Sequence, residues 1–242
     1  MERIEGQELL DLDQWTSEEV DCALGAIRRV NLWYGGDRMH KRLFYRVASR
    51  FSLKKLDVLE VASARGEVIQ AVARALSKRN IRLQISLLDR SQLHLPRPEN
   101  WDLSLGEPKL LVGDALEIPL ADHSVDVVSC CLFLHHLSPD NVRTFLKEAS
   151  RVARVAVLIN DVERTRANYH LSRLYTLIDP SSLSRHDGPT SVRQAYTSKE
   201  LLDLLRETGC NFNVERGFLF RLGAILWKNG FSPERATAGE PQ

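Results

Sequence analysis

Acidic residues stand at or near the ends of apolar runs in this chain, where the strands of a parallel sheet present chemical groups. Residues 56–61 form an apolar, β-branched run that contains Glu60, and residues 81–88 form a second run that ends at Asp89. Open α/β sheets bind ligands at the carboxyl ends of their strands. A carboxylate such as Asp89 can accept hydrogen bonds from both hydroxyls of a ribose, and it follows the first turn by about 20 residues, as nucleotide-binding units require. The alternative is that Asp89 caps the next turn.

The residues after Glu60 are small and lead into a helical pattern. Ala62, Ala64 and Gly66 stand at alternate positions, and apolar residues then recur every three to four positions as far as Leu76. Strand, small-residue turn and helix form the opening unit of a doubly wound α/β sheet, whose helix N-terminus offers N–H groups to a nucleotide-like ligand. An ordinary tight turn from strand to helix is the alternative.

The order Glu60, Ala62, Ala64, Gly66 resembles the first motif of class I S-adenosylmethionine (SAM) methyltransferases, usually written (D/E)-x-G-x-G-x-G. Only the last glycine of that motif is kept. Many turns of this kind require only a small side chain, so we expect both alanines to be tolerated without a left-handed backbone. The two alanines also leave open an inactive, methyltransferase-like binding or scaffold protein as the alternative to an enzyme.

Residues 113–126 carry the most specific resemblance. They begin Gly113-Asp114-Ala115 and are similar to the G-D-A-x-x-(I/L)-P-(F/L)-x-D block of small-molecule methyltransferases. The resemblance implies that the cofactor is SAM, that Asp114 meets its adenine amino group and that Ala115 leaves room for the flat base. We assign Asp89 and the adjacent Arg90 to the same cofactor site.

Two adjacent histidines, His135 and His136, follow the fourth predicted strand and resemble the family's apolar-x-x-H-(H/W)-apolar segment. A histidine is the usual base near neutral pH, so both are candidate catalytic residues for taking a proton from the methyl acceptor. The apolar residues 132–134 are expected to desolvate His135 and to favour its neutral form. A hydrogen-bonded structural role is the alternative for each histidine.

The substrate pocket is expected to form from segments outside the cofactor motifs. Trp33 and Tyr34 precede the pair Gly35-Gly36 and form either a hinged lid over the pocket or an anchor between two helices. Residues 179–191 are predicted to be a loop that forms a pocket wall. The candidate pocket residues are Trp33, Tyr34, Asp161, Tyr169, His170 and His186.

The chain is expected to adopt an α/β fold with a Rossmann-like, seven-stranded, mostly parallel sheet and helices on both faces. A closing antiparallel hairpin is predicted at residues 212–216 and 218–227, where the resemblance to methyltransferases places one. Residues 1–52 form an N-terminal helical lid, since they are too few to bury a core of their own. Residues 53–228 form the SAM-dependent methyltransferase domain, and 229–242 a flexible tail.

Composition limits the partners. A net charge of +1 gives no bulk attraction to nucleic acid, and no apolar run approaches the length of a membrane span. Four scattered cysteines lack zinc-type spacing, so no metal site is expected and a reducing cytoplasm fits best. We expect a monomer or homodimer with a small-molecule substrate, and neither nucleic acid nor membrane as partner.

Other enzyme classes match the sequence less well. A short-chain dehydrogenase needs Tyr-x-x-x-Lys, whereas Tyr196 and Lys199 are one residue too close. Amino-directed DNA methyltransferases carry (D/N)-P-P-(Y/F) after the fourth strand, where this chain has Cys131-Leu132-Phe133-Leu134. We therefore expect in-line methyl transfer from SAM to a small apolar or aromatic molecule, with O-methylation favoured and N- or C-methylation open.

Overall fold

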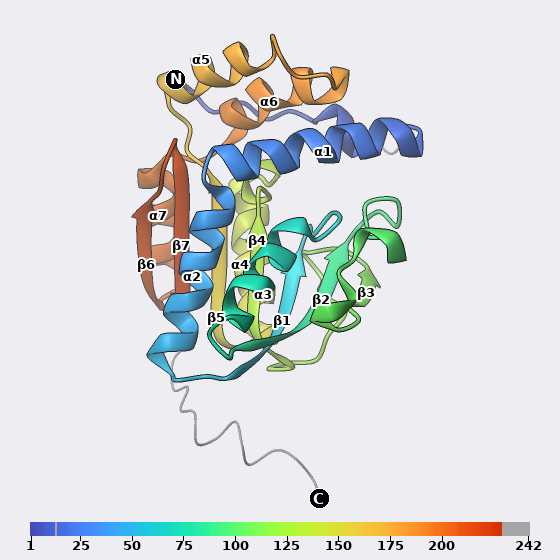
Figure 1. Cartoon of the computed structure of the whole chain (residues 1–242). Coiled ribbons are helices and arrows are strands. Elements are labelled where there is room, and N and C mark those ends of the chain that lie inside the picture. Colours follow the sequence, from blue (N-terminus) through green and yellow to red (C-terminus); the bar gives the residue numbers. More distant parts are fainter. Residues whose placement is uncertain (13, 229–242) are drawn as a thin grey trace, which may run out of the picture.

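A computed structural model describes residues 1–12 and 14–228, so the tail predicted at 229–242 lies outside the described residues. Its centre is a seven-stranded sheet in the order β3-β2-β1-β4-β5-β7-β6 (Figure 1). All neighbouring strands are parallel except at β7, which runs antiparallel to both β5 and β6. The strands are β1 Lys55–Val61, β2 Arg82–Asp89, β3 Lys109–Val112, β4 Val125–Cys131, β5 Ala153–Val162, β6 Asn211–Arg216 and β7 Arg221–Trp227.

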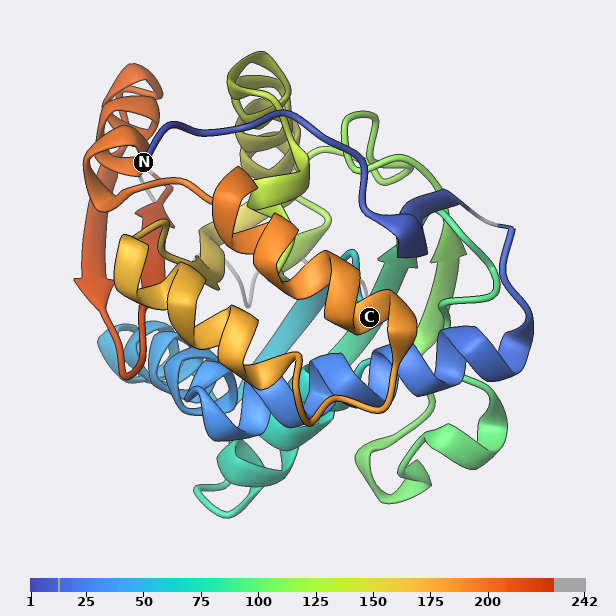
Figure 2. The same ribbon diagram turned by 90° about the horizontal axis from the view of Figure 1, so that it is seen from above.

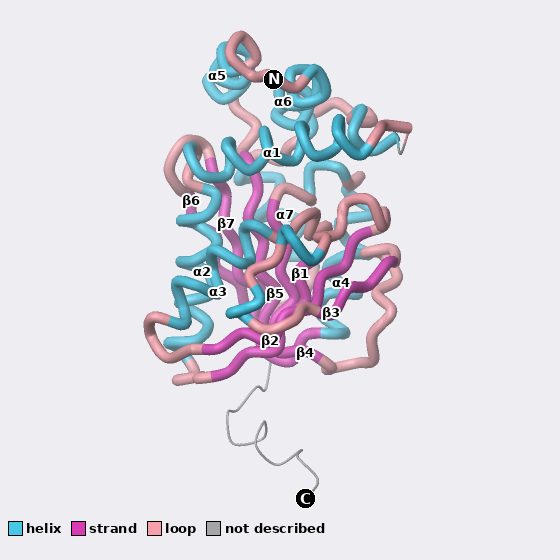
Figure 3. Tube along the Cα trace, turned by 45° about the vertical axis from the view of Figure 1, so that its right-hand side comes forward, coloured by secondary structure: helices cyan, strands magenta, loops and turns pink. Residues whose placement is uncertain are grey.

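Helices cover both faces of the sheet and one of its edges. Helices α2 and α3 pack on one face, and α4 and α7 on the other (Figures 1 and 3). Helices α1, α5 and α6 lie across the carboxyl ends of the strands, as the view from above shows (Figure 2). The helices are α1 Ser17–Trp33, α2 Gly36–Arg50, α3 Glu67–Ser77, α4 Pro139–Val152, α5 Arg166–Tyr175, α6 Ser182–Gln194 and α7 Ser198–Glu207.

The alternation of side chains along β1 explains why the sheet has a core on each face. Leu56 and Val58 pack with α2 and α3, whereas Leu59 and Val61 pack with α4 and its neighbours. Successive side chains of a strand point to opposite faces, so a continuous apolar run suits a strand that helices cover on both sides. The predicted fold class and closing hairpin are confirmed.

One predicted loop is wrong. Most of residues 179–191, expected to be irregular, belong to α6, although Pro189 lies inside that helix. Proline removes one backbone donor, and Gly188 weakens the helical pattern further. Two neighbouring hydroxyls bond to helix carbonyls: Thr190 donates to His186 O at 3.1 Å and Ser191 to Asp187 O at 2.9 Å. Ser181 caps the helix by accepting from the N–H of Ser184.

Residues 1–52 divide into two parts in space. Helix α2 contributes Leu43, Phe44 and Val47 to the core beside α3, so it belongs to the helical layer of the sheet. Helix α1 and the preceding residues belong to the cover of the carboxyl edge (Figure 2). The lid function of this region concerns motion and stays a prediction. In the described ranges no helix has both the length and the apolar character needed to cross a membrane.

Residues 3–12, which we call the strap, cross the carboxyl edge beside α6. The strap begins with Arg3 and Ile4, which bond to the carbonyls of Gln194 and Arg193 at 2.6 and 3.2 Å. It ends in a short 3-10 helix, Leu9–Leu12. The backbone N–H groups of Leu9 and Leu10 donate to the two carboxylate oxygens of Asp187 at 2.9 and 3.0 Å. Asp187 therefore caps that helix and fixes the strap over the sheet.

Replacing Asp187 by alanine is expected to loosen the strap, because two backbone donors lose their acceptor. A lost helix cap costs about 1–2 kcal/mol. Hydrogen exchange of the amides of residues 9 and 10 should therefore accelerate about tenfold in Asp187→Ala. The exposed Asp203→Ala on α7 is the matched control and should leave the strap unchanged. Equal exchange in both variants would mean that other contacts hold the strap.

Candidate functional site

A cavity of about 560 Å³ lies at the carboxyl edge of the sheet, under the cover formed by α1, α5, α6 and the strap. The volume lies within the range of ligand pockets, roughly 300–1,000 Å³. Ten of the predicted site residues border on this cavity. They are Tyr34, Glu60, Ala62, Ala64, Asp89, Arg90, Asp114, Ala115, His135 and His136.

The turn after β1 has a left-handed backbone at both alanines. Ala62 has φ 51° and Ala64 φ 46°, and Gly66, which precedes α3, has φ 69°. The expectation that these positions need only a small side chain is therefore wrong, because both alanines occupy a region that glycine fills without steric cost. Asp89 stabilises the turn, since its carboxylate accepts from the N–H of Ala64 at 3.1 Å.

Glu60 is buried and fully partnered at the end of β1. The Ser129 hydroxyl on β4 donates to its Oε2, and Nε2 of His40 on α2 lies 3.2 Å from its Oε1. Both partners are inaccessible to solvent. A buried carboxylate needs such partners, so Glu60 ties β1, β4 and α2 together while it borders on the cavity.

Asp89 and Asp114 differ in how much of each carboxylate the protein already uses. Asp89 is buried and accepts from the N–H groups of Ala64 and Ser91, and His94 Nδ1 lies 3.3 Å from it. Asp114 is exposed to the cavity and accepts one bond within the protein, from the N–H of Leu116 at 2.8 Å. Asp114 thus retains acceptor capacity for a ligand amine.

His135 is buried beside two carboxylates. Its Nδ1 lies 2.7 Å from Asp161 Oδ1, and its backbone N–H donates to Oδ2 of the same residue at 3.2 Å. Burial alone would lower the pKa of His135, but Asp161 and Glu8 outweigh it and raise the pKa to about 10. The expectation of a neutral, desolvated imidazole is therefore wrong: His135 is an imidazolium at neutral pH.

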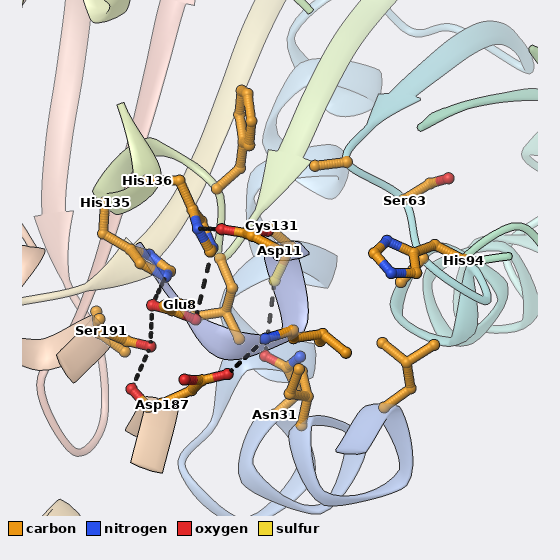
Figure 4. A pocket seen from close by; sticks show the side chains of 18 of the residues that line it. Glu8, Asp11, Asn31, Ser63, His94, Cys131, His135, His136, Asp187 and Ser191 are labelled. Carbon is orange, nitrogen blue, oxygen red and sulfur yellow. Dashed lines mark hydrogen bonds and ion pairs between the residues drawn. The ribbon is translucent and has the colours of Figure 1, made fainter. Parts of the chain in front are cut away.

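His136 lies beside His135, with ring centres 4.3 Å apart (Figure 4). Its Nδ1 lies 2.9 Å from Asp11 Oδ2, and its Nε2 faces Glu8. Glu8 also accepts from the Ser191 hydroxyl of α6 at 2.6 Å. Burial would raise the pKa of Glu8, but the two imidazoles lower it, so Glu8 is a carboxylate.

Six predicted site residues do not line the cavity, namely five candidate pocket residues and Gly66. Trp33 is 54% exposed and meets the ring of Tyr175 edge to face, as Tyr34 does. Asp161 lies behind His135 and orients it. The remaining three, Tyr169, His170 and His186, lie on α5 and α6 away from the cavity wall, with both histidines exposed. Gly66, a predicted cofactor residue, also lies behind the wall, at the start of α3.

Several cavity residues escaped the sequence interpretation. Glu8 and Asp11 lie in the strap, which has no periodic pattern or motif, and His94 lies in a Pro-rich connection. Arg28 is on the polar side of α1 and pairs with Asp37 at 2.6 Å. Asp187 lies within residues 179–191, the segment predicted to form a pocket wall, and it borders the cavity although most of that segment is helical.

Comparisons with known proteins agree with this geometry. Residues 59–157 match the family model described as "Methyltransferase domain". Ribosomal RNA-processing protein 8 of Mus musculus is 40% identical over 63 residues, which are 26% of this chain, and the Rattus norvegicus protein matches equally. The match spans only 13% of those curated relatives.

Solved structures share the fold over most of the chain. The plantazolicin methyltransferase BpumL in complex with SAH has a TM-score of 0.67 and 11% identity, with 91% of this chain and 92% of that chain covered. A SAM-dependent methyltransferase from Aquifex aeolicus has a TM-score of 0.54 and 20% identity, over 76% of this chain and 88% of that one. At these identities the likeness establishes the fold alone.

A sheet of this order with an antiparallel β7 and a cavity over its acidic carboxyl edge defines the class I methyltransferase type. Residues 59–157 accordingly match a methyltransferase domain, and the fold around them is that of SAM-dependent methyltransferases. The domain match and the structural neighbours crystallised with SAH support the predicted family, enzyme class and cofactor.

Replacing Ala62 and Ala64 by glycine is expected to stabilise the protein. A left-handed alanine costs ~1–2 kcal/mol, and the extra chain entropy of glycine offsets about half of the gain. Urea denaturation of the double variant should show the free energy of unfolding raised by about 1 kcal/mol. Ala75→Gly in α3 is the matched control and should lower it by about the same amount. A loss of stability in the double variant would contradict the claim that the left-handed backbone of Ala62 and Ala64 costs free energy.

The raised pKa of His135 predicts a pH dependence of stability. A group with a raised pKa in the folded state stabilises the protein fully below its unfolded pKa of about 6.5 and loses this contribution as pH rises toward about 10. The free energy of unfolding should therefore fall between pH 6.5 and 10, by an amount on the order of a few kcal/mol. His135→Gln should lose this slope, and the exposed His123→Asn should keep it. An identical slope in both variants would contradict the assignment.

Proposed function

We propose that this enzyme transfers the methyl group of SAM to a small, largely apolar or aromatic molecule held under the helical cover, with an oxygen as the favoured acceptor. The observation that carries the proposal is the cavity itself. It continues from the acidic residues at the carboxyl edge of the sheet, Glu60, Asp89 and Asp114, into a space lined by α1, α5 and α6. Enclosure favours a small acceptor, because methyl transfer benefits from exclusion of water and in-line positioning.

The cofactor half of the cavity is proposed to hold SAM as the sequence motifs imply. Asp89 accepts from the ribose hydroxyls, Asp114 from the adenine amino group, and Ala115 faces the base. Arg90 lies at the rim, where its guanidinium contacts Asp11 of the strap. Arg28 on α1 borders the same cavity and offers a positive charge for the carboxylate of the methionyl part.

The acceptor half is apolar with a polar end. Its apolar wall includes Ile27 of α1, Tyr34 at the end of that helix, Phe133 after β4 and Val192 of α6. The polar end consists of Glu8, His135 and His136. SAM brings its own leaving group, so the residues here need only orient the acceptor and manage its proton. Since His135 is already protonated, His136 is the remaining candidate to receive that proton.

An RNA acceptor is the second candidate, and it rests on the short match to ribosomal RNA-processing protein 8. The cover formed by α1, α5 and α6 argues against it, because a nucleotide would have to be turned out of its strand to enter the cavity. The net charge of +1 offers little attraction to phosphates.

The absence of disulfides among the four cysteines supports a reducing, cytoplasmic location.

Asp114→Asn is expected to weaken SAM binding while the turn stays intact. The amide oxygen still accepts from Leu116 N–H, but the carboxylate charge that favours the adenine amine is lost. The cost should be about 1 kcal/mol, or roughly fivefold in affinity measured by calorimetry. Asp89→Ala should cost ~1–3 kcal/mol, since a buried charged acceptor is removed. The distant surface variant Asp203→Ala should bind SAM normally, and unchanged affinity in Asp114→Asn would remove that residue from the site.

The acceptor class is tested with methyl-labelled SAM. The wild-type protein is incubated with a panel of phenols, hydroxyquinones, aromatic amines and aromatic carboxylates, and in parallel with total RNA. Label on a phenolic oxygen supports the proposal, whereas label on RNA alone overturns it. Val192→Trp fills the acceptor half and should abolish transfer while SAM binding is retained. Transfer that survives this filling would place the acceptor elsewhere.

A further inference from the structure

Glu8, His135 and His136 present three ligand-type atoms to one point at the polar end of the cavity (Figure 4). Their ligand atoms all lie within 4.8 Å of one another. Glu8 and His135 are buried, and the His136 side chain is 25% exposed. The group comes from two distant parts of the chain, the strap and the short 3-10 helix Leu134–His136 after β4.

Each histidine of this group is held at its outer nitrogen by a carboxylate, and Glu8 is held by a hydroxyl at Oε1, the oxygen that faces His135. Asp161 holds Nδ1 of His135 at 2.7 Å, and Asp11 holds Nδ1 of His136 at 2.9 Å. The Ser191 hydroxyl donates to Glu8 at 2.6 Å. Metal-binding histidines almost always carry such a carboxylate or carbonyl on their second nitrogen, which fixes the tautomer and aims the first nitrogen at the ion.

The inward distances are longer than the outward ones. His135 Nε2 lies 3.5 Å from Glu8 Oε1, and His136 Nε2 lies 4.0 Å from Glu8 Oε2. Both exceed ordinary hydrogen bonds of about 2.7–3.2 Å. Adjacent ligands of a tetrahedral ion with bonds of ~2.0–2.1 Å are roughly 3.3–3.5 Å apart, so the two distances between imidazole and carboxylate are close to those that an ion between them requires.

We propose that Glu8, His135 and His136 form a binding site for one divalent first-row transition ion, with Zn²⁺ as its representative. The ion would displace the proton that His135 Nε2 carries in its absence, because an imidazole that binds a metal must be neutral. Two imidazoles and one carboxylate are a ligand set of catalytic zinc sites, which keep a further position open. Mg²⁺ and Ca²⁺ prefer oxygen ligands and fit this set poorly. The cavity beside His136 supplies space for the open position.

The role of the ion rests on the proposed function. An acceptor hydroxyl or carboxylate oxygen that reaches the open position would be held at the polar end of the cavity. A bound divalent ion also lowers the pKa of a coordinated hydroxyl, so the acceptor would lose its proton to water before the methyl moves. His136 would then serve as a ligand, and a separate protein base would not be required.

Metal binding is tested on the full chain, stripped with a chelator and then titrated with Zn²⁺ against a chromogenic competitor, and with Co²⁺ by visible absorption. We expect one ion per chain and a Co²⁺ spectrum of nitrogen and oxygen ligands. His136→Gln and Glu8→Gln should weaken Zn²⁺ binding at least tenfold. Asp11→Asn, which removes the carboxylate that orients His136 but keeps all three ligands, should weaken it by about 10–100-fold.

The matched control is His123→Asn, an exposed histidine at the opposite edge of the sheet, which should bind Zn²⁺ like the wild type. Affinity that falls in His123→Asn but not in His136→Gln would overturn the site, as would no Zn²⁺ binding by the wild type. SAM calorimetry on the same samples separates the two proposals. SAM binding without Zn²⁺ binding rejects only the metal site, and Zn²⁺ binding without SAM binding rejects only the cofactor assignment.

Discussion

Every carboxylate buried at the carboxyl edge of the sheet must be hydrogen-bonded. This requirement determines which segments meet at that edge. Glu60, Asp89 and Asp161 end or nearly end β1, β2 and β5, and each is less than 10% exposed. An unpartnered charge at such depth costs several kcal/mol, so each carboxylate recruits partners from distant segments. Glu60 binds α2 and β4, Asp89 binds the first turn, and Asp161 binds His135. The cavity is the space left between these partnered groups.

Three of the eight non-glycine residues that have a left-handed backbone in the described part of the chain border the same cavity. Ala62, Ala64 and Leu132 border it, and each has a left-handed backbone that a side chain disfavours. Such residues persist only where the surroundings over-determine them, and they cluster at functional sites. Here the N–H of Ala64 is held by Asp89, and the N–H of Leu132 donates to the carbonyl of Asn160 at 2.9 Å. The strand ends therefore approach the cofactor space closely even where glycine is absent.

Local patterns in the sequence account for most of the fold. Helix α4, for example, combines an apolar face with Ser138, whose side chain accepts from the N–H of Asn141 and caps the helix. Helix α6 was missed because Gly188 and Pro189 oppose a helix locally, whereas contacts with the distant strap at Asp187 and Ser191 hold it in the folded protein. The order of the strands followed from the resemblance to a known family.

Candidate site residues could be chosen from the sequence where the residue type alone suggests a role. The charge and the backbone conformation of a residue could not be predicted where they depend on contacts with distant residues. The acidic residues and the two histidines were recognised from their places at strand ends. The charge of His135 was misjudged because Asp161, 26 residues away, outweighs the adjacent apolar residues 132–134. The backbone of the first turn was misjudged because small side chains do not reveal the sign of φ. Glu8 and Asp11 could not be predicted as site residues, since the strap has no periodic pattern or motif.

Two different parts of the chain therefore build the two halves of the cavity. The methyltransferase domain match ends at residue 157, before α5 and α6, and begins at residue 59, after the strap and α1. The cavity residues at the sheet edge, from Glu60 to Ala115, lie within this match. Arg28, Glu8 and the segments that cover the cavity lie outside it. Any contact that a bound molecule makes with the strap, α1, α5 or α6 is therefore made with parts of the chain that the domain match does not include.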